Sequence, residues 1–257
     1  MPERGVLKKV YVYDGSFEGI LCAVHRAYYS KEEPEEIVKS DALQRDLFSE
    51  YVYIQIDRKK SDAVYSSIST KISSNALFLL YNVFLSEEPD KATVIYQYLR
   101  RGYALGAKVA LHFQDPWVLR AQKISQYVSL EAQRLSGFLR FSQMEGNILY
   151  SAISPVNNIL ELLCQYFADR LPSQPWVIAD TKRRMAGVYN GERWVISEVD
   201  AASLPGETAD ELEYQKLWRA FYNTIGIAGR KNHNLRRQLM PKMYWKNMTE
   251  FKYDDRI

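Results

Sequence analysis

Positive charge near the C-terminal end of the chain, with aromatic residues beside it, is the feature that best indicates a chemistry. Residues 230–246 hold six Lys or Arg side chains and no Asp or Glu, although the whole chain is nearly balanced, with 34 basic and 31 acidic residues. Such a segment is typical of a surface that meets phosphate, and its aromatic rings could stack on bases. A solvated amphipathic end would have the same composition. The candidate residues are Arg230, Lys231, Arg236, Arg237, Lys242, Tyr244, Trp245 and Lys246.

A second group of cations, Lys182, Arg183 and Arg184, lies between two predicted strands. Loops of this kind contact phosphate in many nucleic-acid-binding proteins, but three charges on a loop can also serve only solubility. The phosphate interpretation gains weight if this loop lies beside the C-terminal segment.

Groups for catalysis or metal binding are few. His25, His112 and His233 are scattered, and Cys22 and Cys164 lie in apolar helical patterns that are typical of buried free thiols. The sequence therefore predicts no catalytic residue, no metal site and no cofactor, and whether the chain is an enzyme stays open.

Three carboxylates leave open the alternative that the chain is itself an enzyme. Asp14 and Asp180 lie at the ends of predicted strands, Glu18 follows Asp14 in the strand-to-helix turn, and each could act as acid or base. The segment 14–19 has two glycines at a strand-to-helix turn, but it lacks the Lys-Ser/Thr ending of a phosphate loop. A capped tight turn is the favoured interpretation.

The elements that must position these residues form an α+β protein. A mostly helical α/β half is expected over residues 1–137, with strands at 9–13 and 51–56. A helix capped by Ser16 separates these strands, so we expect them to be parallel. The acidic stretch after Ser30 is interpreted as a connection.

An α+β half is expected over residues 138–257, because the periodicity changes at Gly137. It should contain a β-hairpin, a helix, a three-stranded sheet and a basic C-terminal helical segment. Asn190-Gly191 is the strongest hairpin signal in the chain. The predicted strands are 138–143, 148–153, 175–179, 185–189 and 193–196.

Bulk composition sets the broad class. A hydrophobic content of 47% and a charged content of 25% are ordinary for a globular protein. No apolar run is long enough to span a bilayer, and the first residues lack the apolar core of a signal peptide. We therefore expect a cytoplasmic protein with no membrane partner.

Several stretches spread over nearly the whole chain carry a resemblance to a known family. They are 11–19, 137–141, 147–155, 176–183, 217–236, 240–246 and 249–251, with Tyr189 and Trp194. Together they resemble a bacterial family of DNA-repair or DNA-metabolism proteins, itself a domain of unknown function. Met243 departs from the family pattern, which has a basic residue after Met-Pro-Lys.

The resemblance implies a role on DNA. Genes of that family often stand beside a gene for a radical-SAM protein, and its domain can be fused to a uracil-DNA-glycosylase-like domain, whose motifs are absent here. The expected function is a nucleic-acid-binding accessory to a radical-SAM repair or modification enzyme, with DNA and that enzyme as partners. The alternatives are an enzyme that acts directly on damaged DNA and a protein–protein adaptor.

Overall fold

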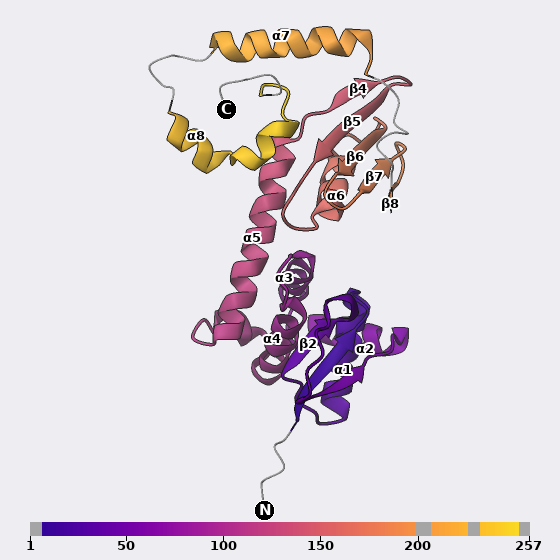
Figure 1. Cartoon of the computed structure of the whole chain (residues 1–257), viewed down its shortest axis with the longest axis vertical. Coiled ribbons are helices and arrows are strands. Elements are labelled where there is room, and N and C mark those ends of the chain that lie inside the picture. The colour runs from indigo at the N-terminus through magenta and orange to yellow at the C-terminus, as the bar shows by residue number, and fades with distance from the viewer. Residues whose placement is uncertain (1–6, 199–206, 226–231, 252–257) are drawn as a thin grey trace, which may run out of the picture. The chain divides into compact units, whose positions relative to one another are not determined.

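The structure is a computed structural model that describes residues 7–198, 207–225 and 232–251 (Figure 1). The chain is α+β, as the sequence predicts, and it divides into two compact units, Met1–Ser129 and Leu130–Ile257. The division falls inside helix α5 (Pro116–Phe138), whereas the change of periodicity places it at Gly137.

A parallel sheet with strand order β2-β1-β3 begins the first unit. The parallel pairing predicted for strands 9–13 and 51–56 is confirmed, because β1 and β3 pair in parallel with Val10 opposite Tyr51. The acidic stretch that was expected to be only a connection contributes a third strand, because Ile37 is buried there and pairs with Tyr11. The strands are β1 (Lys8–Tyr13), β2 (Glu36–Lys39) and β3 (Ser49–Tyr53).

Helices make up most of the remainder of the first unit. Ser16 caps the first of them as predicted, since its hydroxyl accepts a hydrogen bond of 2.9 Å from the Gly19 amide. Ile20, Leu80 and Leu99 come from three different helices and are fully buried in one core. The helices are α1 (Phe17–Tyr29), α2 (Arg58–Lys71), α3 (Ser74–Leu85), α4 (Lys91–Leu105) and the first part of α5.

The second unit contains a five-stranded sheet with strand order β4-β5-β6-β7-β8. The two predicted hairpins, β4–β5 and β7–β8, are antiparallel pairs of this sheet. Strands β5 and β6 pair in parallel, with helix α6 as the crossover between them, so the hairpin and the three-stranded sheet are continuous. The elements are β4 (Ser142–Met144), β5 (Ile148–Ile153), α6 (Leu160–Arg170), β6 (Trp176–Asp180), β7 (Met185–Tyr189) and β8 (Trp194–Glu198).

Helix α6 packs closely against this sheet. Its buried residues Leu163, Cys164 and Phe167 face the strands, and a methyl group placed on Gly187 of β7 would lie 2.1 Å from the Cys164 sulfur. Burial raises the pKa of the Cys164 thiol to about 12, so the thiol stays protonated and acts as a small apolar group.

Three further helical segments lie in the described part of the second unit. Among the described residues, no helix is both long and apolar enough to cross a bilayer. The segments are α7 (Ala209–Ile225), α8 (His233–Leu239) and the short 3-10 helix η5 (Lys242–Asn247).

The contact between Gly187 and Cys164 makes a direct prediction. Gly187→Ala should lower the free energy of unfolding by about 1–3 kcal/mol, because the new methyl group overlaps the sulfur. Urea denaturation measures this change. In the Cys164→Ala background the same substitution should cost markedly less; an equal cost in both backgrounds would show that the sulfur is not what excludes the methyl group.

Candidate nucleic-acid interface

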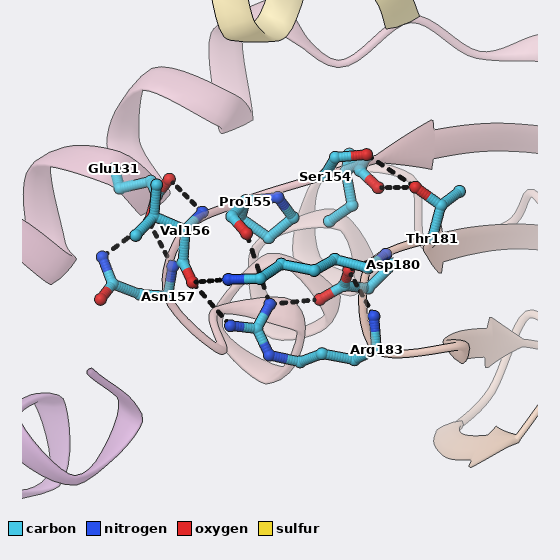
Figure 2. Close-up of polar contacts among 10 residues, drawn as sticks. Glu131, Ser154, Pro155, Val156, Asn157, Asp180, Thr181 and Arg183 are labelled. Atoms are coloured by element: carbon cyan, nitrogen blue, oxygen red, sulfur yellow. Dashed lines mark hydrogen bonds and ion pairs between the residues drawn. The ribbon is translucent and has the colours of Figure 1, made fainter. Parts of the chain in front are cut away.

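Two loops leave the sheet side by side at the carboxyl ends of β5 and β6. Ile153 and Asp180 are paired at the ends of these parallel strands, and the next residues, Ser154 and Thr181, have hydroxyl oxygens 2.6 Å apart (Figure 2). The carboxyl ends of parallel strands are a common place for ligand sites, because the loops that follow them converge. The predicted cation group 182–184 lies on the loop that follows β6.

A buried ion pair fixes the loop after β6. Asp180 is 1% exposed, and one of its carboxylate oxygens lies 2.8 Å from an Arg183 nitrogen. The other oxygen accepts the backbone amide of Lys182 at 3.0 Å. The Arg183 guanidinium also donates to the Val156 carbonyl at 2.7 Å, which joins this loop to the loop after β5 (Figure 2).

A second buried carboxylate, Glu131 of α5, holds the loop after β5. Its oxygens accept the backbone amides of Val156 and Asn157, both at 2.8 Å, and the Asn157 side-chain amide at 2.7 Å. The Tyr244 hydroxyl donates a further bond of 2.9 Å from η5. The C-terminal basic segment and the 182–184 loop are therefore attached to the same short stretch, because Val156 bonds to Glu131 on one side and to Arg183 on the other.

Several predicted cations of the two basic segments are exposed. Lys182 is exposed, although its ammonium donates to the Val156 carbonyl at 3.0 Å. Arg184 is exposed and has a left-handed φ of 55°. The other exposed cations of the predicted site are Arg237, Lys242 and Lys246.

A comparison with known protein families matches residues 89–250 to DUF4130, a domain of unknown function. The chain belongs to the DUF4130 family. Neither a comparison with curated proteins nor one with solved structures finds a match. The DUF4130 match includes the whole framework built on Glu131, whereas the parallel sheet of the first unit precedes it.

The two aromatic residues assigned to this surface of the DUF4130 region are buried, which corrects that assignment. Tyr244 is 5% and Trp245 is 3% exposed. The indole of Trp245 donates to the Met240 carbonyl and stacks on Phe251, with ring centroids 4.7 Å apart. These rings belong to the interior and have no face to offer to a base.

Two of the predicted cations also have structural positions. Arg183 is held by Asp180 as described, with only 16% of its side chain exposed. The Arg236 guanidinium lies over the rings of Trp245 and Phe251, at 4.7 and 5.4 Å from their centroids. Arg230 and Lys231 lie outside the described residues.

The carboxylates considered for catalysis are engaged locally. Asp14 is exposed and accepts hydrogen bonds from the Ser16 amide and hydroxyl, as expected for a tight turn. Glu18 is exposed in the first turn of α1, and Asp180 is held in its ion pair. In the part of the chain that the structure describes, no cluster of three or more His, Cys, Asp or Glu side chains could hold a metal ion.

Glu131 and Asn157 are functional-site residues that were not predicted from the sequence, although the sequence contains a signal for Glu131. The sequence pattern of the helix opened by Asp115-Pro116 predicts that Leu119, Ile124, Val128 and Leu135 face the core; the last three are buried and Leu119 is half-buried. Glu131 lies at the helical spacing between Val128 and Leu135, so an acid stands on the buried face of α5. Such an acid needs several donors to compensate its burial.

Tyr244→Phe should therefore destabilise the protein. The variant keeps the ring but removes one donor from a buried carboxylate, and we expect the free energy of unfolding to fall by about 1–3 kcal/mol. Urea denaturation measures it. The matched control is Tyr214→Phe, at a tyrosine that is 67% exposed, which should change stability little. Unchanged stability in Tyr244→Phe would contradict the role given to this hydrogen bond.

Proposed function

We propose that the chain is a DNA-binding accessory protein that presents DNA to a radical-SAM repair or modification enzyme. One observation carries the DNA-binding part: the two acid-poor basic segments are fixed to the same short stretch through Glu131 and Val156. Lys182, Arg184, Arg237, Lys242 and Lys246 are exposed on these two segments. The radical-SAM enzyme as partner rests on the family resemblance of the sequence.

The composition of this surface favours contact with the DNA backbone. Lysine and arginine bind phosphate irrespective of sequence, whereas base recognition needs groups that read base edges or stack on bases. The burial of Tyr244 and Trp245 removes the aromatic component. We therefore expect weak binding with little sequence preference and a strong dependence on salt.

A binding role is better supported than a catalytic one. Asp180 is tied to Arg183 and to the loop backbone, and Asp14 is bonded within its own turn. Neither carboxylate has the arrangement of a free acid or base beside a substrate cavity. In this proposal the partner enzyme supplies the chemistry.

The Arg237→Ala/Lys246→Ala variant tests the DNA surface. If both cations contact phosphate, the plot of log affinity against log salt concentration should become shallower by about two contacts, at roughly 0.9 for each. Fluorescence anisotropy of a labelled DNA duplex over a range of salt concentrations measures these slopes.

Arg170→Ala/Arg193→Ala is the matched control. Both arginines are exposed, and they lie at or beside the opposite end of the same sheet, where Trp176 pairs with Tyr189. The control should keep the wild-type slope. Equal slopes in all three proteins, or no binding at low salt, would overturn the proposed DNA surface.

A specific observation favours protein docking as a second function. Five large apolar side chains of α7 are between 41% and 67% exposed and recur at helical spacing along one stripe. A groove of about 800 Å³ lies along this stripe and also includes Arg140, Phe141 and Thr249. Exposed apolar patches of this kind mark interaction sites. The stripe consists of Tyr214, Leu217, Trp218, Phe221 and Ile225.

We propose that this stripe receives an amphipathic helix of the partner enzyme. Helix-in-groove recognition matches the length and spacing of the stripe. Asp210 and Glu213 are exposed in the first turns of α7, within the acid-rich stretch 198–213. Charge complementarity therefore assigns the occupant a basic flank beside its apolar face.

Leu217→Ser/Phe221→Ser tests the docking stripe. Both side chains are exposed, so the fold should be retained while co-elution with the radical-SAM partner on size exclusion is lost. Val195→Ser, at another exposed apolar position, is the control and should co-elute as the wild type does. Co-elution of the double variant would contradict the proposal, and self-association of the wild type that the double variant abolishes would assign the stripe to a second copy.

A further inference from the structure

A hollow of about 320 Å³ lies in the first unit, between α1, α2 and α4. Its volume is near the lower limit of small-molecule sites and is sufficient for a single nucleoside. The hollow is independent of the cations in the second unit. The aromatic and polar side chains that line it are His25, Tyr28, Tyr29, Ser67, Lys71 and Tyr103.

Two consecutive tyrosines give this hollow unusually open aromatic surfaces. Tyr28 is 70% and Tyr29 is 72% exposed, although both lie in the last turn of α1. Their rings meet edge to face at 5.4 Å, and Tyr29 is stacked on His25 at 4.3 Å. Open aromatic faces beside a hollow suit a flat ring, because stacking on a nucleobase requires no particular base.

Polar groups inside the hollow can bond to the edge of such a ring. The Ser67 and Tyr103 hydroxyl oxygens lie 2.6 Å apart across α2 and α4. Burial and the charge of Lys60 lower the pKa of His25, which favours the neutral imidazole, a form with one donor and one acceptor nitrogen. Lys71 adds a cation to the lining.

A second hollow of about 290 Å³ adjoins the first and shares Tyr28 and Tyr103 with it. It contributes another cation, Lys31. The acids of this second hollow are already paired: Glu32 with Lys9 at 2.9 Å, and Glu33 with Arg100 at 2.6 Å. The charges of Lys31 and Lys71 are therefore available for an anion.

We propose that these hollows bind a nucleotide, with its base against Tyr28 and Tyr29 and its phosphate near Lys71 or Lys31. Aromatic faces, edge-bonding groups and unopposed cations occur together here, and that combination fits a base joined to a phosphate better than it fits an apolar peptide. The nucleotide is either free or one unit of a single DNA strand. This site goes beyond the DNA surface of the second unit and does not depend on it.

The experiment uses the full chain and two probes, deoxyadenosine monophosphate and a labelled single-stranded (dA)12. Calorimetry measures the first and fluorescence anisotropy the second. Tyr28→Ala/Tyr29→Ala should weaken binding about fivefold or more, by a similar factor at low and at high salt, because stacking is nearly uncharged. Lys71→Ala should instead reduce the salt dependence.

Two further variants keep the test decisive. Tyr127→Ala removes a ring that is 53% exposed on α5, outside both hollows, and should leave binding unchanged. Tyr28→Phe/Tyr29→Phe keeps both aromatic faces and should bind as the wild type does; a loss equal to that of the alanine variant would show that the hydroxyl groups, and not stacking on the rings, hold the ligand.

The outcomes separate the two sources of the nucleotide. Tyrosine-dependent binding of the monophosphate assigns the site to free nucleotides, and tyrosine-dependent binding of (dA)12 alone assigns it to a DNA strand. Failure of both probes to bind, or an equal loss in Tyr127→Ala and the Tyr28/Tyr29 alanine variant, overturns the proposal. A failure of salt-dependent duplex binding with both nucleotide probes still bound would contradict the proposed DNA surface of the second unit and leave the nucleotide site in the first unit supported.

Discussion

The buried carboxylate of Glu131 is the constraint on which the arrangement of the second unit depends. Removing a charge from water costs several kcal/mol unless hydrogen bonds replace the lost hydration. Here two backbone amides, one side-chain amide and one tyrosine hydroxyl replace it. Because these donors come from a loop and from η5, satisfying one charge brings three separate parts of the chain together. Their mutual geometry is therefore set by electrostatics as much as by apolar packing.

The cations of this unit divide according to what surrounds them. Arg183 reaches a buried acid and two backbone carbonyls, and Arg236 covers two aromatic rings. Both arginines stabilise the unit from within. Arg184 and Arg237 are neighbours of these residues in sequence but are exposed. Residue type alone does not distinguish a structural arginine from an exposed one. The distinction depends on the partners that the fold places beside each side chain. The arginines with partners stabilise the unit, and the exposed ones contribute positive charge to its surface.

Local patterns in the sequence predicted most of the elements but not their long-range partners. The Ser16 cap, the two hairpins and the helix that begins at Pro116 follow from signals within a few residues, and all are present. The parallel pairing of β5 with β6 and the bond between Glu131 and Tyr244 join residues far apart in sequence. The spacing of residues along the sequence does not indicate which distant residues form such pairs. For the same reason Tyr244 and Trp245 were predicted to be surface groups, whereas the structure places both in the core.

The DUF4130 match starts at residue 89, inside the first compact unit, so its boundary does not coincide with a boundary of packing. Helix α4 begins at Lys91, yet its Thr93 hydroxyl accepts the buried backbone amide of Ile37 in β2, at 2.9 Å. Its Leu99 lies in one core with Ile20 of α1. A fragment cut at the family boundary would leave these groups facing water. The region that the family model matches and the compact unit in which α4 packs therefore have different limits, so the packing of α4 depends on residues that precede the match.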